Sequence, residues 1–523
     1  MPTTYAKHFS TRATPQSEPV PGTPQVANSA GGYSFAVDDW TRLERFLILG
    51  NEGGSYYASE KALTVENARC VQRCLAADAA RTVETIAAVS ESGRAPKNDP
   101  AVFALAICSA HPAALAALPR VCRIGAHLFQ FIDQARAFRG RGRAFNRAVA
   151  AWYLDRKPRD LAYQVTKYQQ RGGWSHRDVL RLVKPKAEGP TGTIMRWAVG
   201  KQTESAMLGV DSLAPVLGYE KAKVATTAKE TARLIREFRL VRECVPTERL
   251  NSPEVWEALL EEMPMHALLR NLGKMSNVGL VKPMSNAAGE IVRRFEDKDA
   301  VRKSRLHPLA ILLAQRTYAA GKGQKGSLTW TPDNQIVDAL EDAFYAAFDN
   351  ATPTGKRHLL AIDVSGSMGG GSVAGTSLTP REASAAMALV TVRAEPKTHT
   401  MMFATTFQAA DLGKTTALRD AVKKLSRANF GGTDCALPML YALQHKIEAD
   451  VFVVYTDSET WFGGIHPVQA LRQYREKMGI PAKLIVVGMV RNGFTIADPA
   501  DAGMMDVVGF DAAAPAVMAD FAR

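Results

Sequence analysis

The chain has 523 residues, of which 46% are hydrophobic and 22% charged, and its formal net charge at pH 7 is +13. This length predicts about two to four domains with large cores, and the charged fraction is ordinary for globular proteins. Six cysteines without a CxxC pair argue against a disulfide scaffold and predict free, buried thiols in a reducing compartment, the cytoplasm.

The first 33 residues form a Pro-, Ser-, Thr- and Gly-rich segment. This composition predicts an arm and not a domain. The first residues lack the apolar core of a signal peptide. The most apolar run, residues 101–118, is interrupted by Ser109, His111 and Pro112, so we interpret it as a buried helix and not as a membrane span.

Residues 34–345 are predicted to be helical. Asp38 can cap a helix that carries Leu43 and Phe46, and Ser252-Pro253-Glu254 has the composition of a helix start. Residues 228–242 space apolar side chains between charges, as an amphipathic helix does. Helix pairs in succession, without a strict sequence repeat, would suit a degenerate solenoid.

Residues 346–523 have a different pattern. Four short apolar runs, each of four to six residues, alternate with helical stretches such as 382–392 and 467–477. The runs are 358–362, 400–403, 451–455 and 483–487. Strands that alternate with helices predict a doubly wound α/β domain with a parallel sheet.

The second domain contains the strongest short motif, Asp363-Val-Ser365-Gly-Ser367, directly after its first predicted strand. Ligands gather at the carboxyl ends of strands in such sheets. Thr433, in a Gly-rich loop, and Asp457, after another strand, can reach the same edge. Five hard oxygen donors suit Mg²⁺ or Mn²⁺. The alternative is a simple turn at the strand end, but the pattern resembles the metal-ion-dependent adhesion site of von Willebrand factor A domains.

Positive charge is concentrated in one part of the first domain. Residues 101–200 contain 17 basic and 5 acidic residues, a net of +12, whereas the remaining segments sum to about +1. Such a region would attract a polyanion such as RNA. A solvated basic face without a partner is the alternative.

The segment 165–178 is the most informative part of this region. Lys167 and Arg171 are four residues apart, which predicts one helix face, and Gly172-Gly173 would end that helix. Ser175 and Asp178 form a capping-box pattern for the next helix. His176 and Arg177 would then lie at a helix N-terminus, where backbone amides favour a phosphate.

Trp174 could stack on a base, although packing at a helix junction is the more common role of such a residue. His176 alone would more often be a surface histidine. Upstream, four arginines form a run with glycines between them, which is either an extension of the basic surface or a solvated loop. These are Arg136, Arg139, Arg141 and Arg143.

Several long motifs in order resemble the Ro autoantigen family, and especially its bacterial members. They are residues 46–57, 118–124 (which include Arg123), 165–178, 263–274 and 457–460, and with the two ends of the chain they cover nearly all of it. The resemblance implies a TROVE module, which is a ring of HEAT-like helical repeats with a basic hole, joined to a von Willebrand factor A-like domain. It also implies that the intact acidic-hydroxyl motif binds a metal ion.

Members of this family bind small noncoding Y RNAs on the outer surface of the ring and single-stranded 3′ ends of misfolded or unprocessed RNA in the hole. The bacterial members act with exoribonucleases in ribosomal RNA maturation and in RNA decay under stress. The resemblance assigns His176, preceded by Lys167 and Arg171, to Y RNA binding. The family has no established catalytic activity.

Two other functions fit parts of the sequence. A protein-adhesion module would use the metal ion to capture a carboxylate of a protein partner. A metal-dependent nuclease usually gathers several carboxylates around paired ions. Two acids and three hydroxyls are a poor set for that chemistry, so we expect no enzyme activity.

Overall fold

The computed structural model describes residues 13–50, 60–138, 142–201, 207–323, 327–348, 353–370, 373, 376–427, 431–490 and 492–523. It divides into two compact units. The first combines the chain up to Cys70, residues 94–97 and the chain from Phe348 onward, and the second combines residues 71–93 and 98–347.

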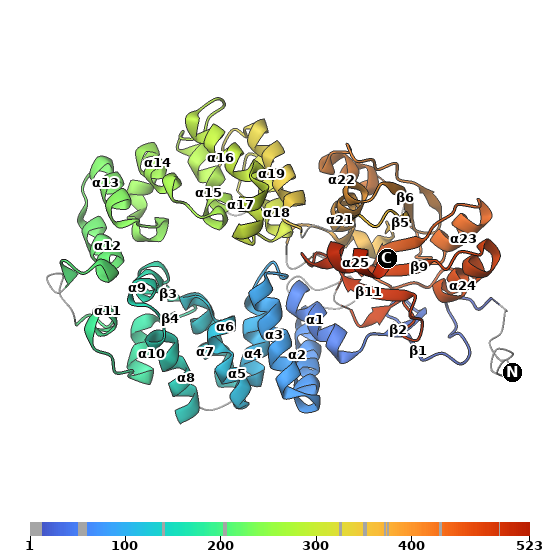
Figure 1. Ribbon diagram of the computed structural model, residues 1–523, viewed down its shortest axis with the longest axis horizontal. Coiled ribbons are helices and arrows are strands. Elements are labelled where there is room, and N and C mark those ends of the chain that lie inside the picture. Colours follow the sequence, from blue (N-terminus) through green and yellow to red (C-terminus); the bar gives the residue numbers. More distant parts are fainter. Residues whose placement is uncertain are drawn as a thin grey trace. The chain divides into compact units, whose positions relative to one another are not determined.

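The second unit is a succession of helices that pack on their neighbours in the chain (Figure 1). Its first half contains α3 (Ala79–Ser92), α4 (Asp99–Ile107), α5 (Pro112–Ala116), α6 (Leu118–Val121), α7 (Gly125–Phe138), α8 (Arg143–Leu154), α9 (Pro158–Lys167), α10 (His176–Val183) and α11 (Gly189–Ala198). Its second half contains α12 (Ala214–Val224), α13 (Ala228–Phe238), α14 (Pro253–Glu261), α15 (Met265–Asn277), α16 (Asn286–Glu296), α17 (Lys298–Ser304), α18 (Pro308–Ala319) and α19 (Asn334–Ala346).

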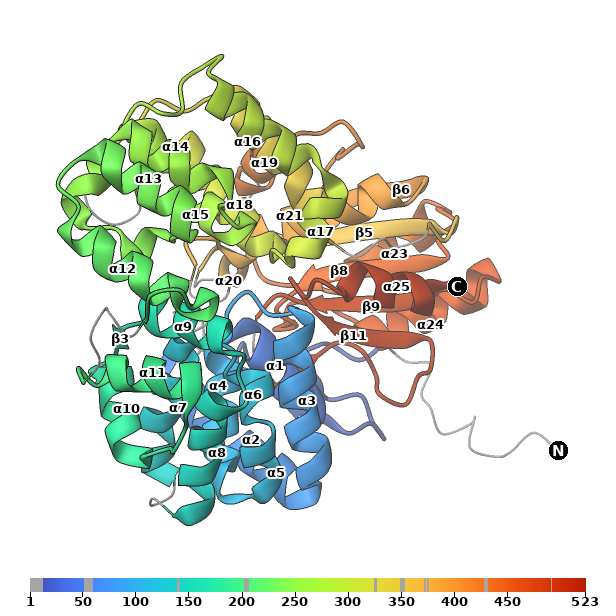
Figure 2. The ribbon, with the colours of Figure 1, turned by 60° about the vertical axis from the view of Figure 1, so that its left-hand side comes forward.

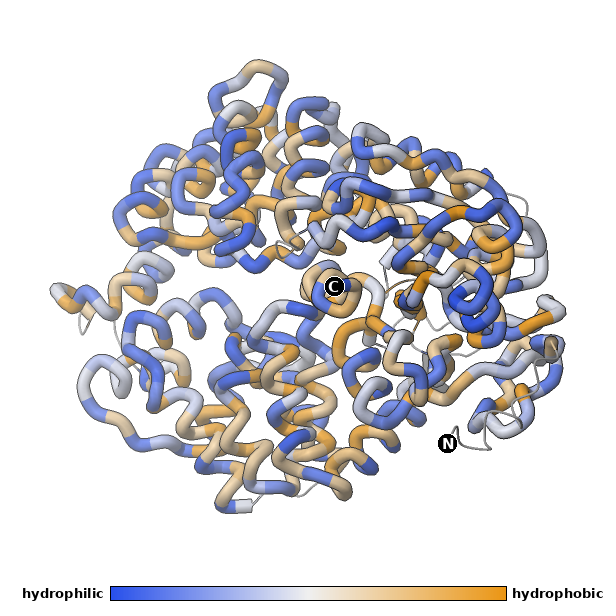
Figure 3. The backbone as a smooth tube through the Cα atoms, turned by 45° about the vertical axis from the view of Figure 1, so that its right-hand side comes forward, coloured by the Kyte–Doolittle hydropathy of each residue, from blue (hydrophilic) through white to orange (hydrophobic). Residues whose placement is uncertain are grey.

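The two ends of this helical unit contact each other. Arg305 follows α17 and donates a hydrogen bond of 3.0 Å to the backbone carbonyl of Glu91, which is 214 residues earlier in α3. Large side chains such as Trp152, Trp256 and Phe295 fill the unit's core. Hydrophobic and hydrophilic stretches alternate along its helices (Figure 3), as expected of helices that bury one face.

The α/β unit is built on a six-stranded sheet in the order β11-β9-β8-β5-β6-β7. Its strands are β5 (Arg357–Asp363), β6 (Lys397–Phe403), β7 (Phe407–Ala409), β8 (Val451–Thr456), β9 (Lys483–Gly488) and β11 (Met504–Val508). All neighbours are parallel except β6 and β7. The four predicted strands and the parallel sheet are confirmed, whereas the short edge strands β7 and β11 were not predicted.

Helices cover both faces of the sheet (Figure 2). They are α20 (Gly366–Gly369), α21 (Pro380–Ala394), α22 (Leu418–Ser426), α23 (Leu437–Gln444), α24 (Pro467–Met478) and α25 (Ala514–Ala522). Alternate strand residues such as Leu359 and Phe452 pack with α23 and α24. Tyr455 faces α21 instead, where its hydroxyl lies 3.1 Å from that of Thr391. Strands buried on both sides explain the continuous apolar runs of the sequence.

The N-terminal segment belongs to the α/β unit, which differs from the predicted boundaries of 1–33, 34–345 and 346–523. β1 (Gln25–Ala27), β2 (Tyr33–Ala36) and β10 (Phe494–Thr495) form a small sheet in which β2 lies between the other two. Gln16 is fully buried and donates to Asp434 at 2.7 Å. Long-range pairing of this kind leaves no local pattern in the sequence.

Two further helices lie in the N-terminal half. α1 (Asp39–Leu49) is capped by Asp38, as predicted, and its buried Arg45 forms an ion pair of 2.6 Å with Asp506 of β11. α2 (Glu60–Ala77) follows and continues into the helical unit. Among the described helices, none is long and apolar enough to cross a membrane. The six cysteines are buried and free, as predicted.

Candidate functional sites

The first candidate site lies at the carboxyl end of β5 and β8. Asp363 is the last residue of β5, and its carboxylate accepts hydrogen bonds from the backbone N–H of Ser365 at 2.9 Å and from the hydroxyl of Thr456 at 2.7 Å. The hydroxyls of Ser365 and Ser367 are 3.2 Å apart. Ser367 also forms a hydrogen bond with Asp457, which follows β8 directly. The structure therefore brings four of the five predicted metal ligands together.

Thr433 occupies the neighbouring loop and is also buried. Its backbone carbonyl accepts hydrogen bonds from the amides of Trp461 and Phe462, both at 3.1 Å. This loop is therefore tied to the loop that follows Asp457. The N-terminal segment also contacts the loop that follows Asp457, because the hydroxyl of Ser34 donates to the carbonyl of Ser458 at 2.9 Å.

The pKa values of both carboxylates of this site are raised. Burial, followed by the charge of Asp457, raises the pKa of Asp363 to about 7. Burial also raises the pKa of Asp457. A divalent cation would relieve both effects, and carboxylate and hydroxyl oxygens are the donors that Mg²⁺ accepts. Within the described residues no group of three or more His, Cys, Asp or Glu side chains gathers as in a metal site.

Arg381 is a buried cation beside this site that no sequence pattern indicated. Its guanidinium donates to the backbone carbonyls of Val364 and Ser365 at 3.1 and 2.9 Å. It is close enough to Asp363 for the two charges to interact, although burial lowers the pKa of Arg381. Arg381 therefore fixes the turn that presents the two serines.

The second candidate site is the basic region of the helical unit, where one prediction was wrong. Lys167 is the last residue of α9, but Arg171 lies in β3 (Gln170–Arg171). β3 pairs with β4 (Trp174–Ser175) in a hairpin, and the positive φ angles of Gly172 and Gly173, 57° and 78°, form its turn. The two glycines make a hairpin turn, as such pairs commonly do, and do not end a helix there.

His176 is buried, contrary to the surface position expected for it. Only 3% of its surface is exposed, and its Nδ1 lies 2.8 Å from the hydroxyl of Tyr153. Burial is the main reason why the pKa of His176 falls to about 4, so the ring is neutral at pH 7. The capping box of Ser175 and Asp178 is confirmed. His176 is the first residue of α10, and its ring packs against Phe129 of α7 and Trp152 of α8. This packing suits a positioning role better than direct contact with a phosphate.

The remaining predicted cations are mostly exposed. Arg136, Arg143, Arg171 and Arg177 are all at the surface. The guanidinium of Arg136 lies 4.6 Å from the ring centroid of Trp174. One face of this ring is therefore already covered by an arginine of the same chain. Arg139 and Arg141 lie outside the described residues.

Two predicted cations are partly engaged within the unit. Lys167 donates to the hydroxyl of Tyr163 at 2.7 Å. Burial alone would lower the pKa of Lys167, but this bond and the neighbouring Tyr168 raise it. Arg123 donates to the hydroxyl of Ser90 at 2.6 Å. Burial, and a smaller repulsion from Arg305, lower the pKa of Arg123. Sequence reasoning missed Arg305 because it is 182 residues further along the chain.

Fold and site together define a class of protein: a helical-repeat RNA-binding module joined to a von Willebrand factor A-like domain. Residues 26–208 and 230–317 match the family model described as the TROVE domain, and residues 357–522 match the Ro60 vWA domain. The chain is 43% identical over 511 residues to the RNA-binding protein RO60 of Deinococcus radiodurans, with 95% of both proteins covered.

The RNA-binding protein RO60 of Caenorhabditis elegans is 36% identical over 580 residues, which cover 95% of this chain and 90% of that protein. The crystal structure of the Deinococcus radiodurans RO (RSR) protein matches with a TM-score of 0.70 and 42% identity, over 93% of this chain and 99% of that one. The chain therefore belongs to the Ro60 family. The curated relatives are named as RNA-binding proteins, in agreement with the RNA binding expected from the sequence.

Proposed function

We propose that this protein binds small noncoding Y-like RNA and the single-stranded 3′ ends of misfolded or unprocessed RNA. In this role it would act with an exoribonuclease in RNA quality control, ribosomal RNA maturation and RNA decay under stress, in the cytoplasm. The observation that carries the proposal is the exposure of Arg136, Arg143, Arg171 and Arg177 within the segment of net charge +12. Exposed guanidinium groups bind phosphate well.

The test compares the full chain with the double variant Arg171→Glu/Arg177→Glu. The probes are a hairpin RNA with a single-stranded 3′ tail and the same hairpin without the tail. Each lost phosphate contact should lower the slope of log K against log salt concentration by about 0.7 to 0.9. Arg419→Glu is the matched control, because Arg419 is 86% exposed but lies in the other unit. Equal affinity and slope in all three proteins would refute the proposal.

The proposed role with an exoribonuclease has its own assay. Purified exoribonuclease should degrade the tailed hairpin faster when the full chain is present, and the double variant should remove this effect. RNA incubated with the chain and Mg²⁺ alone should stay intact, because the candidate site supplies only two carboxylates. An unchanged degradation rate would exclude this part of the proposal while leaving RNA binding intact.

We further propose that Asp363, Ser365, Ser367, Thr433 and Asp457 hold Mg²⁺ or Mn²⁺. Support comes from the two buried carboxylates with raised pKa values and from the two serine hydroxyls beside them. Calorimetric titration of the EDTA-treated chain with MgCl₂ should show one site, which Asp457→Asn should abolish. The same variant should bind RNA normally if the two sites act independently.

A protein partner at the metal site is a second candidate function. Trp461 and Phe462 are 40% and 53% exposed, form an edge-to-face pair 5.6 Å apart and are tied to the carbonyl of Thr433. Exposed aromatic residues are enriched among interface residues that dominate binding energy. A partner would place a carboxylate on the ion and an apolar side chain against this pair. EDTA and Trp461→Ala/Phe462→Ala should release the same partner, without effect on RNA binding.

A further inference from the structure

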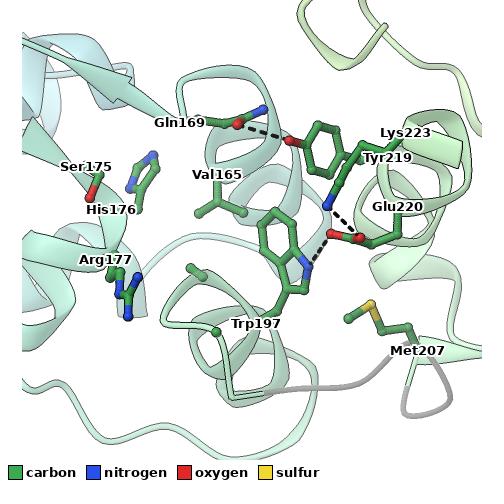
Figure 4. A pocket seen from close by; sticks show the side chains of 12 residues that line it. Val165, Gln169, Ser175, His176, Arg177, Trp197, Met207, Tyr219, Glu220 and Lys223 are labelled. Atoms are coloured by element: carbon green, nitrogen blue, oxygen red, sulfur yellow. Dashed lines mark hydrogen bonds and ion pairs between the residues drawn. The ribbon is translucent and has the colours of Figure 1, made fainter. Parts of the chain in front are cut away.

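A pocket of about 440 Å³ opens in the helical unit (Figure 4). Its lining comes from α9, α10, α11 and α12 and from four residues between them, Gln169, Ser175, Gly200 and Met207. It includes Arg177, Trp197, Tyr219, Glu220 and Lys223. The volume is within the range of pockets that hold small organic groups. Only Arg177 among these five residues was singled out in the sequence, because the others lie in α11 and α12 and belong to no recognisable motif.

Trp197 forms a fixed aromatic wall of the pocket. Its indole N–H donates to Glu220 at 3.0 Å, and its ring meets that of Tyr219 edge to face, with centroids 5.8 Å apart and planes at 86°. A hydrogen bond on one side and a ring on the other hold the indole in one orientation. A flat, half-exposed indole of this kind is suited to stacking on an unpaired base.

Glu220 is a hydrogen-bond acceptor in the lining of the pocket. One carboxylate oxygen accepts from Trp197, and the other accepts from the ammonium of Lys223 at 2.8 Å. A carboxylate offers about four acceptor positions and no donor, so each oxygen can accept one more hydrogen bond. A ligand that uses both oxygens must present two adjacent donors.

Among the four RNA bases, guanine presents two such donors side by side on its Watson–Crick edge, N1–H and the N2 amino group. Adenine and cytosine place an acceptor next to their single amino group, and uracil has one N–H between two carbonyls. A carboxylate would repel each of these acceptors. The exposed cations Arg177 and Lys223 lie on the same pocket and suit the phosphates that flank a base.

We propose that this pocket binds an unpaired guanine base of RNA, stacked on Trp197 and held at its Watson–Crick edge by Glu220. This inference rests on the proposed RNA binding of the chain and names the base that one part of it recognises. The guanine would be in a single-stranded or bulged position, since a paired base has its Watson–Crick edge occupied.

The test measures the binding of fluorescent heptanucleotides to the full chain by anisotropy. The probes are heptauridine, the same strand with one central guanosine, and the same strand with central inosine, which lacks the N2 amino group. Wild-type protein should bind the guanosine strand about a hundredfold more tightly than heptauridine and the inosine strand about tenfold more tightly, because each hydrogen bond to a charged group is worth a factor of about ten.

Glu220→Gln should remove the guanosine preference, because it weakens binding of the guanosine strand far more than it changes binding of heptauridine. The matched control is Glu188→Gln, which changes an exposed glutamate outside the pocket lining and should keep the preference. Trp197→Phe tests the stacking wall. Phenylalanine keeps an aromatic surface and disturbs folding less than a small residue would. This variant should reduce affinity for the guanosine strand by less than Glu220→Gln does.

Three results would overturn the inference. Equal binding of guanosine and uridine strands by the wild type would exclude a guanine pocket, and so would an unchanged preference in Glu220→Gln. Binding of free GMP as tight as that of the guanosine strand would make the pocket a nucleotide site and not an RNA site. Failure of every strand to bind would instead count against the proposed function itself.

Discussion

Replacement of Asp363 by Asn should stabilise the metal-free protein, although it removes a predicted metal ligand. The carboxyl of Asp363 is fully buried, and its pKa rises from 3.8 to about 7. Above pH 4 the carboxyl of Asp363 ionises more readily in the unfolded chain than in the folded protein. This difference costs stability, and the cost grows as pH rises until the folded pKa is passed.

The magnitude follows from the shift. About three pKa units correspond to about 4 kcal/mol at pH 8, and about 1 to 2 kcal/mol of this cost is already present at pH 5. The amide of the Asp363→Asn variant would carry no charge. This amide could keep both hydrogen bonds, because the hydroxyl of Thr456 can accept as well as donate. The advantage of the variant over wild type should therefore grow by about 2 to 3 kcal/mol between pH 5 and pH 8.

The assay is urea unfolding of the full chain in EDTA at both pH values, followed by circular dichroism. Addition of MgCl₂ should stabilise the wild type and have no effect on the variant, since binding to the folded state alone raises stability. Asp520→Asn is the control, because Asp520 is 79% exposed and should change stability by less than about 0.5 kcal/mol. A variant less stable than wild type in EDTA at pH 8 would refute the reasoning.

Three further substitutions test other parts of the structure. Gly125→Ala would place a Cβ 2.9 Å from Nε2 of His176 and 3.0 Å from Cβ of Tyr168, so it should cost about 1 to 3 kcal/mol in urea unfolding and weaken RNA binding; an unchanged unfolding midpoint would contradict this packing. Arg45→Met leaves the nearly buried carboxylate of Asp506 without its ion-pair partner and should lower the free energy of unfolding by about 3 to 5 kcal/mol. A loss below about 1 kcal/mol would show that water reaches this carboxylate. Gln16→Ala removes the buried donor to Asp434 and to the carbonyl of Ile465, so it should cost about 1 to 3 kcal/mol and lower the melting temperature of the α/β unit; equal melting would mean that the N-terminal segment contributes no stability.

Local patterns in the sequence predicted much of this protein. Short apolar runs ending in Asp363 and Tyr455 predicted the parallel strands, and Ser175 with Asp178 predicted a capping box, because strand burial and helix capping depend on neighbouring residues. The DxSxS motif likewise predicted Asp363, Ser365 and Ser367 at one strand end, because the three residues are close together in the sequence. The net charge of residues 101–200 also needs no structure to be counted.

Contacts between distant parts of the chain were decided only by the tertiary structure. The ion pair of Arg45 with Asp506 and the bond of Gln16 to Asp434 join residues more than 400 positions apart, and they bring the N-terminal segment into the α/β unit. His176 was expected at the surface, but the helices around it exclude water. The pocket of Trp197 and Glu220 forms only where four helices meet. Burial and the meeting of helices are properties of packing that no local pattern records.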